Sequence, residues 1–461
     1  MRNYPSITAN EAYFRRLVNT IEETATIPSE LYEQYDIKRG LRNANGSGVL
    51  VGITHIASVV GYKQEDGKKI PAHGELLYRG IPLRSIVSGF QSQSRLGFEE
   101  VVFLLMFGEL PTPKELLDFH ILLDSMRDLP LQYKEDVILK IPSRDIMNKL
   151  QRNILCLYSY DDNPDDTDMR NVLLQSLQII SKFPLIVAYC FQAKRHYLDK
   201  KSLVLHQPIG GLSTSETLLS LIREDSYYTK EEAELLDLLL VVHAEHGGGN
   251  NSAFATHVVS SSGTDTYSAI ATALGSLKGP KHGGAALKVF AMFQDAFNRI
   301  RDLNDEGATR DYIRRLINKE AYDRSGLVYG LGHAVYTLSD PRAILLKEKA
   351  KELAYQKGSP YKERLDFLIR FEELAGEELK AALNTEYTLG ANVDFYSGFV
   401  YDMLGFPKEL FTPLFATSRM AGWCAHRLEQ LTDSRIIRPG YVTIGERREY
   451  IQPEKRRGLG S

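Results

Sequence analysis

The chain contains 461 residues, of which 43% are hydrophobic and 25% charged, and its formal net charge at pH 7 is −3. This length predicts two or three domain-sized units, each able to bury its own core. The near balance of charge excludes a strongly basic nucleic-acid-binding protein and gives no electrostatic reason to expect a membrane surface as a partner. Anionic ligands must therefore be met by local groups of basic side chains.

The N-terminal residues and the cysteines indicate a cytoplasmic protein. Residues 1–24 mix acids with bases and lack the apolar core of a signal peptide. No apolar run approaches the roughly 20 residues that a membrane-spanning helix requires. Cys156, Cys190 and Cys424 lie far apart in apolar segments, which favours reduced core thiols over a disulfide framework or a paired-cysteine metal site.

The first predicted elements are two short strands. Within residues 48–80, the β-like segments "GVLVGITHIASVVGY" and "GELLYRGI" flank the turn signal "QEDGKK", so they are expected to pair as a hairpin. No other part of the chain has this pattern, and the rest shows helical periodicity. The sequence therefore predicts an all-α fold with one small β-hairpin near the N-terminus.

Two later segments show clear helix signals. In residues 98–126 apolar residues recur every three or four positions, Gly108 closes the first helix, and "PTPKE" opens the next, which predicts a helix hairpin. Thr229 and Glu232 then form a capping-box pattern before an apolar run that continues to Gly247. This run predicts a buried helix ending at His246.

Five polar clusters stand out in the second half of the chain. They are residues 243–252, 277–284, 330–342 and 392–398, and the pair 417–419 with 435–439. Three of them join histidine to glycine, which lets a ligand approach the backbone closely and frees N–H groups to face an anion. A single histidine at a helix end is more often a cap or core residue. The joint occurrence of three histidine–glycine clusters nevertheless favours a ligand-binding site.

A metal site is the obvious competitor for these histidines. His243, Glu245, His246 and His257 are all potential ligands. However, no HExxH or paired-cysteine pattern completes a coordination shell. We therefore expect no metal site.

Three arginines have a context that suits anion binding. Arg342, Arg419 and Arg438 are far apart in sequence, and each lies beside glycine, proline or a small residue. Guanidinium groups bind carboxylates bidentately, with a geometry that lysine cannot copy. The alternative, that they are surface arginines at helix ends, stays open at this point.

Asp394 has apolar and aromatic neighbours in Val393, Phe395 and Tyr396. Desolvation there would raise the pKa of the carboxyl group and make it a stronger base than an exposed aspartate. Such a group suits removal of a proton from carbon. A helix N-cap is the alternative interpretation of Asp394.

The ordered motifs "HAEHGGGNNS", "GPKHGG", "GHAVYTLSDPR", "NVDFYSG", "TSR" and "RP" closely resemble those of the citrate synthase family. The likeness runs from about residue 40 to residue 439 and covers most of the chain. The resemblance implies an all-helical fold with a large domain formed by residues 1–284 and 405–461 and a small domain formed by residues 285–404. It also implies a homodimer.

The resemblance further implies a reaction that condenses acetyl-CoA with oxaloacetate and water to give citrate and CoA. Asp394 would remove a methyl proton from acetyl-CoA, while neutral His282 donates a hydrogen bond to the thioester oxygen. His333 would donate to the ketone oxygen of oxaloacetate. No permanently bound cofactor is implied, because acetyl-CoA is a co-substrate.

Binding residues are carried over in the same way. The two carboxylates of oxaloacetate would be held by His246, Arg342, Arg419 and Arg438, and Arg438 would reach across from the partner subunit. Asn250 would help to shape the pocket. The coenzyme would lie against Lys278, Gly279, Lys281, Gly330, Leu331 and Gly332.

The sequence departs from the family pattern at three positions. Many relatives have basic residues one and four positions after the histidine of "GHAVYTLSDPR", near the coenzyme phosphates, but Ala334 and Thr337 stand there in this chain. Lys278 and Lys281 are the expected substitutes. Ala286 also occupies a position where numerous members have asparagine.

Two other functions compete with citrate synthesis. A 2-methylcitrate synthase would use propionyl-CoA and needs room for one more methylene, a difference of about 1–3 kcal/mol that unaligned pocket residues do not reveal. A catalytically silent helical dimer that binds a dicarboxylate is the other. The presence of both Asp394 and His282 argues against a silent protein, because binding alone needs neither.

Overall fold

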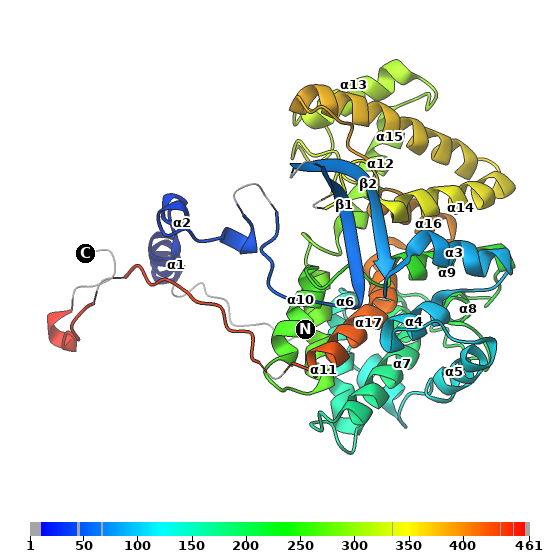
Figure 1. Cartoon of the computed structure of the whole chain (residues 1–461), viewed down its shortest axis with the longest axis horizontal. Helices are drawn as coiled ribbons and strands as arrows, with labels where there is room; N and C mark the ends of the chain where they lie inside the picture. Colours follow the sequence, from blue (N-terminus) through cyan, green and yellow to red (C-terminus); the bar gives the residue numbers. More distant parts are fainter. Residues whose placement is uncertain are drawn as a thin grey trace. The chain divides into compact units, whose positions relative to one another are not determined.

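The computed structural model describes residues 11–43, 47–65, 68–333, 335–433, 435–445 and 447–456. The chain forms two compact units, Met1–Val51 with Arg438–Ser461, and Gly52–Ile437. The first unit contributes the dark-blue segment with α1 and α2 and the red segment near the C-terminus in Figure 1. Its helices are α1 (Glu11–Ala25), α2 (Glu30–Gln34) and the 3₁₀ turns η2 (Arg39–Leu41) and η6 (Pro453–Lys455).

The second unit begins with a three-stranded antiparallel sheet of order β1–β2–β3. Its strands are β1 (Ala57–Glu65), β2 (Lys68–Tyr78) and β3 (Ile81–Pro82). The hairpin of β1 and β2 confirms the predicted strand pair, although β1 begins at residue 57 and not near residue 48. Residues 66 and 67 of the predicted turn lie outside the described residues.

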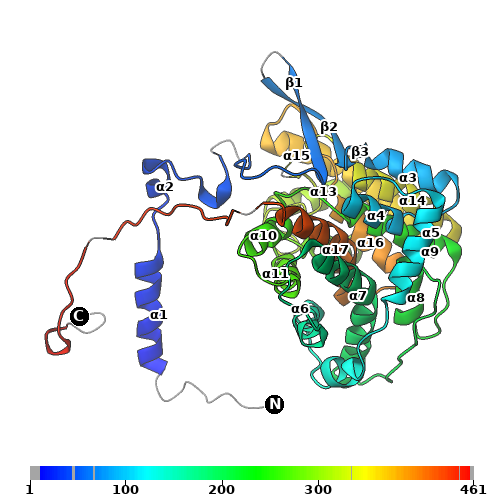
Figure 2. The same ribbon diagram turned by 60° about the horizontal axis from the view of Figure 1, so that its bottom comes forward.

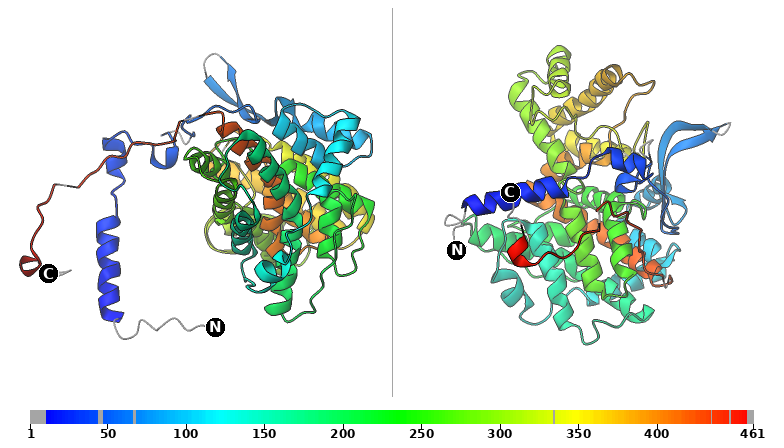
Figure 3. Two further views of the ribbon diagram at one scale, coloured as in Figure 1. Left: turned by 90° about the horizontal axis from the view of Figure 1, so that it is seen from below. Right: turned by 90° about the vertical axis from the view of Figure 1, so that its left-hand side faces the viewer.

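The hairpin supports the loop that follows His333. Thr337 Oγ1 donates hydrogen bonds to the carbonyl oxygens of Gly61 at 2.7 Å and of Ala72 at 3.2 Å. A Cβ at Gly61 would lie 2.1 Å from the carbonyl oxygen of Val335, so only glycine permits this approach. Figure 3 shows the far end of the hairpin extending beyond the helices, which agrees with its exposed side chains.

The helices between the hairpin and residue 278 form the larger part of the second unit (Figure 1). Most of them follow one another with short connections, and a longer segment, residues 198–213, joins α7 to α8. Their bounds are α3 Leu83–Ser92, α4 Phe98–Phe107, α5 Pro113–Ser125, η3 Lys134–Leu139, α6 Ile146–Leu157, η4 Tyr158–Tyr160, α7 Met169–Tyr197, α8 Thr214–Ile222, α9 Lys230–His243, α10 Asn251–Ser260 and α11 Thr266–Lys278.

The next helices gather at the other end of the same unit, where Figure 1 labels α12 to α16. Packing joins α12 to α16, α14 to both α15 and α16, and α13 to α15. They fall within the predicted small domain, residues 285–404, whose boundaries stay a prediction. The bounds are α12 Ala285–Arg299, α13 Glu306–Ile317, α14 Pro341–Lys357, α15 Tyr361–Leu383 and α16 Val393–Met403.

After the short η5 (Lys408–Leu410), the last long helix, α17 (Phe411–Gln430), is buried along almost its whole length. It packs against α4, α7, α9, α10 and α11 and lies among them in Figure 2. Apolar side chains such as Trp423 fill the contacts, and burial of such a ring contributes strongly to the core. α17 is therefore a central element of the helical core.

The expectation that no segment is long and apolar enough to span a membrane is wrong for α7. Within the described part of the chain, α7 alone has the length and apolar composition of a membrane-crossing helix. However, 78% of its most apolar stretch is buried inside the protein. This burial is typical of the central helix of a globular core, where all faces meet apolar neighbours.

The helix signals in the sequence are mostly confirmed. Gly108 adopts the left-handed conformation (φ 88°) at the end of α4, and Thr112 caps α5. Thr229 and Glu232 form the expected capping box. The predicted end of the next helix is wrong, because α9 stops at His243 and leaves His246 in a loop.

Candidate active site

His246 lies in the loop between α9 and α10, with its imidazole directed into a buried polar cluster. Its ring centroid is 5.1 Å from that of His333 and 5.5 Å from that of Tyr336. Nε2 of His246 is buried without a hydrogen-bond partner. Burial and the positive charge of Arg342 lower the pKa of His246 well below its usual value. The group is therefore neutral at pH 7 and has one ring nitrogen available to a ligand.

Backbone hydrogen bonds between residues 330–332 and residues 390–392 hold the loop that carries His333. Gly332 N–H donates to Gly390 O at 2.9 Å, and Asn392 N–H donates to Gly330 O at 2.8 Å. The Asn392 side-chain amide also donates to Gly332 O at 3.0 Å. These contacts fix the loop that carries His333 against the N-terminus of α16.

The tautomer of His333 follows from its own hydrogen bonds. The backbone N–H groups of Val335 and Tyr336 both donate to Nδ1, at 3.0 and 3.2 Å. Burial and Arg342 lower the pKa of His333 to about 4, so the imidazole is neutral at pH 7. Because Nδ1 accepts, the single ring hydrogen lies on Nε2 and can be donated to a ligand.

Arg342 is buried in the first turn of α14, where Asp340 is the N-cap. Its Nε and Nη2 donate to the two carboxylate oxygens of Asp340, at 3.0 and 2.7 Å. The same carboxylate accepts the backbone N–H of Val393 at 3.1 Å. Burial opposes the charged form, yet Asp340 raises the pKa of Arg342 above its usual value. The edge of the guanidinium that carries Nε and Nη2 is therefore already bound to the Asp340 carboxylate.

Arg419 is buried in the middle of α17. Its Nε donates to the carbonyl oxygen of His243 at 2.7 Å, and the guanidinium lies 5.0 Å from the ring centre of Phe415. Nη1 is buried and has no hydrogen-bond partner. An unpaired buried donor of this kind is costly and is usually satisfied by a ligand or water.

Asp394 occupies the first turn of α16, and Asn392, not Asp394, is the N-cap of that helix. The interpretation of Asp394 as the cap is therefore wrong. Burial raises the pKa of Asp394 to about 6, although Arg342 and Arg419 oppose the rise. The residue is of intermediate exposure.

His282 lies in the turn between α11 and α12, as the glycine-rich sequence predicts. Its backbone N–H donates to Gly279 O at 2.9 Å, and Gly283 N–H donates to Leu277 O at 2.9 Å. Burial and the charge of Arg419 lower the pKa of His282 to about 4. The imidazole is therefore neutral at pH 7.

Ser252 connects His282 to the N-cap of α10. Nε2 of His282 lies 3.0 Å from Ser252 Oγ, and the indole N–H of Trp423 donates to the same oxygen at 3.0 Å. The Ser252 hydroxyl donates to Asn250 Oδ1 at 2.9 Å. Asn250 thus shapes the cluster through Ser252 and caps α10 at the same time.

The predicted phosphate-binding lysines differ in their surroundings. Lys278 Nζ lies 3.1 Å from Asp145 Oδ2 in an ion pair, so its charge is partly neutralised. Lys281 is exposed and has no hydrogen-bond or ion-pair partner in the described ranges. Of the two, Lys281 is the one whose charge is not paired with a carboxylate of the described residues.

The predicted coenzyme-binding glycines are needed by the protein's own packing. A Cβ at Gly330 (φ 87°) would lie 2.9 Å from Phe395, and one at Gly283 would lie 2.4 Å from Leu277 O. Leu331 forms a backbone bridge with Ala391. Close packing therefore explains glycine at positions 330 and 283, and the predicted coenzyme contacts stay a prediction. At Gly279 the Cβ would meet Ser276 O at 3.2 Å, and Gly332 has φ 78°.

The three departures from the family pattern have different outcomes. Thr337 is buried and holds the hairpin, as described above. Ala286 is buried in α12. Ala334 lies outside the described residues.

Arg438, the fourth predicted ligand of oxaloacetate, is an exposed residue of the other unit.

Three residues of the cluster, Tyr336, Asp340 and Ser252, were missed in the sequence, and His243 was considered there only as a metal ligand. Tyr336 has a buried hydroxyl without a partner and packs its ring 4.8 Å from that of His333. His243 is buried beside Arg342 and Arg419, which add to burial in lowering its pKa to about 3. Asp340 and Ser252 act through the hydrogen bonds given above. All four residues lie within the quoted motifs, but no characteristic spacing in the sequence marks a tyrosine or a serine as part of a site.

Comparison with known proteins identifies the family. The sequence model described as "Citrate synthase, C-terminal domain" matches residues 44–440. A citrate synthase from Haloferax volcanii is 33% identical over 424 residues, covering 89% of this chain and 97% of the relative. A 2-methylcitrate synthase from Shewanella oneidensis is 31% identical over 382 residues, covering 81% of this chain and 90% of the relative.

Solved structures agree with the sequence comparison. The ternary complex of carboxymethyl coenzyme A and oxaloacetate with citrate synthase from Thermoplasma acidophilum has a TM-score of 0.72 at 25% identity, covering 91% of this chain and 99% of that one. Citrate synthase from Pyrobaculum aerophilum has a TM-score of 0.69 at 29% identity, covering 88% and 94%. The motifs, the helical fold and these relatives together show that the chain belongs to the citrate synthase family.

Proposed function

We propose that the protein is a citrate synthase, which condenses acetyl-CoA with oxaloacetate and water to give citrate and CoA. The observation that carries this proposal is the pair of buried polar atoms without partners, His246 Nε2 and Arg419 Nη1, near a carboxyl group of raised pKa, Asp394. Such atoms suit the carboxylates of a small dianion. Under this proposal the enzyme acts in the tricarboxylic acid cycle.

The first step is removal of a methyl proton from acetyl-CoA by Asp394. A carboxyl pKa of about 6 keeps the base ionised at pH 7 while making it more basic than an exposed aspartate. His282 donates a hydrogen bond to the thioester oxygen as enolate charge develops there. Neutral imidazole suits this role because it stabilises the charge without transferring a full proton first.

The hydroxyl of Ser252 decides which nitrogen of His282 carries the hydrogen. In the free protein this hydroxyl donates to Asn250, so Nε2–H of His282 donates to Ser252 Oγ. The tautomer with hydrogen on Nδ1 is the one that can donate to the thioester, and its Nε2 then accepts the Ser252 hydroxyl hydrogen. The change of tautomer needs a water molecule that takes the proton from Nε2 while another proton reaches Nδ1, together with rotation of the Ser252 hydroxyl away from Asn250.

The second step is attack of the enolate carbon on the ketone carbon of oxaloacetate. Nε2–H of His333 is the donor that polarises the ketone, consistent with the acceptance of two backbone N–H groups by Nδ1. His246, Arg342, Arg419 and Arg438 hold the carboxylates. Water then hydrolyses the citryl thioester, which makes the condensation irreversible.

The wider assembly follows the family pattern. Arg438 is donated across a homodimer interface, and closure of residues 285–404 on the rest of the enzyme completes the site when oxaloacetate binds. The free state of Cys156, Cys190 and Cys424 supports work in the reducing cytoplasm. Acetyl-CoA enters as a co-substrate, with Lys281 the first choice for its phosphates.

A thiol-release assay tests this function on the purified protein. CoA formation that depends on both acetyl-CoA and oxaloacetate is expected. Absence of turnover at high enzyme concentration would reject the proposal. If oxaloacetate then still raised the melting temperature, the protein would be a catalytically silent dicarboxylate-binding dimer instead.

A 2-methylcitrate synthase is the second candidate. Its specific support is the Shewanella oneidensis relative, which matches this chain nearly as well as the citrate synthases do. Comparison of kcat/KM for acetyl-CoA and propionyl-CoA distinguishes the two functions. One methylene corresponds to about 10–200-fold in that ratio, which a standard assay resolves.

A further inference from the structure

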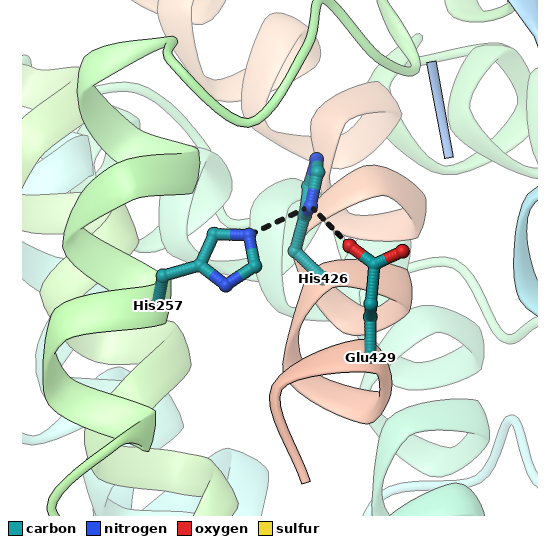
Figure 4. A group of neighbouring side chains, drawn as sticks. All are labelled: His257, His426 and Glu429. Carbon is teal, nitrogen blue, oxygen red and sulfur yellow. Dashed lines mark hydrogen bonds and ion pairs between the residues drawn. The ribbon is translucent and has the colours of Figure 1, made fainter. Parts of the chain in front are cut away.

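A chain of four side chains, three buried and one (His257) partly buried, lies behind the loop that carries His246. His257 Nδ1 is 2.7 Å from Gln430 Oε1, His257 Nε2 is 3.0 Å from His426 Nδ1, and His426 Nε2 is 3.0 Å from Glu245 Oε1. Figure 4 shows the two imidazoles from α10 and α17 facing each other. The chain thus runs from α17 through α10 to Glu245, the residue before His246.

One hydrogen of His426 is fixed by the Glu245 carboxylate, which can only accept, so His426 Nε2 donates to Glu245 Oε1. The hydrogen between His426 Nδ1 and His257 Nε2 depends on the orientation of the Gln430 amide, whose Oε1 lies beside His257 Nδ1 while its Nε2 is buried without a partner. With the amide turned, His426 would be neutral. With Oε1 as the acceptor, His257 Nδ1 donates to Gln430, both nitrogens of His426 carry hydrogen, and the ring is an imidazolium.

The charges around His426 favour this state. Glu245 and His426 have fully buried side chains, and Glu429 Oε2 lies 3.9 Å from His426 Nδ1. Burial opposes the charge, but the carboxylates of Glu245 and Glu429 outweigh it and raise the pKa of His426 to about 9. Other titratable or charged groups that act on this cluster are His257, Arg419 and Tyr78 near Glu245 and His426, and Arg79 and His55 near Glu429.

A metal ion is the competing occupant of the same cluster. Ligand atoms of His257, His426 and Glu429 lie within 4.8 Å of one another. However, the two facing nitrogens are 3.0 Å apart, whereas two nitrogens bound tetrahedrally to zinc at their usual bond lengths lie about 3.3 Å apart. The separation is that of a hydrogen bond, so a shared hydrogen fits the cluster better than a shared ion.

Glu245 transmits the effect of this charge to the site. Its Oε1 accepts the backbone N–H of Gly247 at 2.5 Å, in the turn that directs His246 into the site. A Cβ at Gly422 of α17 would lie 2.1 Å from Glu245 Oε2, so glycine there admits the carboxylate. His426 and Glu245 thus hold the same turn from behind.

We propose that His426 is a positioning residue which, as an imidazolium paired with Glu245, holds the turn of residues 245–247 so that His246 can bind a substrate carboxylate. The inference rests on the proposed function, because it assigns His246 to the oxaloacetate site. His426 touches no substrate itself. Its effect therefore falls on substrate binding more than on the rate of the chemical steps.

The proposal has a definite pH dependence. A histidine whose pKa is raised in the folded state contributes its interaction fully below the unfolded pKa and loses it as pH rises through the folded value. For His426 that value is about 9. The KM for oxaloacetate is therefore expected to rise at alkaline pH while kcat changes less.

His426→Gln and Glu429→Gln test the proposal on the full-length enzyme. Glutamine can still donate to Glu245 but carries no charge, so His426→Gln should raise the KM for oxaloacetate at pH 7 by about tenfold, the equivalent of one pKa unit. It should also abolish the alkaline rise in KM. Glu429→Gln leaves Glu245 untouched, so KM at pH 7 should stay the same while the midpoint of the rise moves down by about one pH unit.

The outcomes separate this inference from the proposed function. Turnover by the wild-type enzyme tests the proposed function alone. An unshifted midpoint in Glu429→Gln, or a fall in kcat without a change in KM in His426→Gln, would overturn the positioning role even if His426→Gln folds poorly. Stoichiometric zinc in the wild-type enzyme, lost in His426→Gln, would show a metal centre and would also overturn it.

Discussion

Single residues of the site owe their protonation states to burial. His282 and His333 have pKa values of about 4, so they are neutral hydrogen-bond donors at pH 7. Asp394 is shifted in the opposite direction, to about 6. Each shift disfavours the charged form, as desolvation requires. The apolar neighbours of Asp394 in the sequence predicted its shift, whereas His282 lies between Lys281 and Gly283, which gave no such signal.

Activity should therefore decline on the acid side as Asp394 becomes protonated. Because a carboxyl group acts as a base only when ionised, kcat/KM should fall as pH drops through about 6. A pH profile of kcat/KM for acetyl-CoA checks this expected fall on the acid side. A profile that stays level down to the usual aspartate range, near pH 4, would contradict the raised pKa.

Replacement of Asp394 by asparagine should remove the base while keeping its volume. We expect kcat to fall by about 10²–10⁴-fold, the usual contribution of a general base, while oxaloacetate binds with little change. Steady-state kinetics and calorimetry measure the two quantities. Asp402→Asn, on the same helix and paired with Arg364 at 3.6 Å, is the matched control and should retain activity.

At the scale of elements, local sequence signals predicted helix starts better than helix ends. The capping boxes at Thr112 and Thr229 involve residues three apart, so the pattern is visible in the sequence. The end of α9 depends on Tyr78, whose hydroxyl donates to Val241 O at 3.0 Å. Tyr78 comes from β2, far away in the chain, so an apolar run alone could not reveal this limit.

The turn between α11 and α12 depends on glycine at position 283. A Cβ there would lie 2.4 Å from Leu277 O, so Gly283→Ala should force the turn apart and lower the free energy of unfolding by about 1–3 kcal/mol. Urea denaturation measures the loss. Gly89→Ala in α3, where a Cβ meets nothing within 4 Å, is the control and should be neutral or slightly stabilising. Equal stability of the two variants would contradict the steric argument.

For the whole molecule, motif order predicted the family and the residues of the candidate site. It did not predict which polar partners complete that site. Asp340 engages Arg342, and His426 pairs with Glu245 across α17 and the loop after α9. These pairs arise only when distant segments pack together. The sequence therefore indicated the main groups but not the supporting contacts that orient them.

The proposed exchange of Arg438 between subunits can be tested by mixing two defective variants. Asp394→Asn should lack the base, and Arg438→Ala should bind oxaloacetate weakly. If each site takes Arg438 from the partner subunit, a mixed dimer has one site with both residues intact. Refolding an equal mixture should then restore about a quarter of the wild-type activity, as random pairing predicts.

The same mixture should stay inactive if Arg438 serves its own subunit. In that case every site in a mixed dimer lacks either Asp394 or Arg438. Two parental variants incubated without unfolding provide the control for slow subunit exchange. Sedimentation of the wild-type protein, which measures its mass in solution, shows independently whether the dimer forms.

The contact between the hairpin and the segment after His333 has a further consequence. Gly61 and Gly74 meet Val335 O and Ser339 O so closely that an added methyl group would lie 2.1 and 2.2 Å from those oxygens. Neither glycine has a side chain that could touch a reactant. In an unbiased survey of variants, alanine at either position should nevertheless rank with the losses expected at His282 and His333, because the strands brace the loop that carries His333.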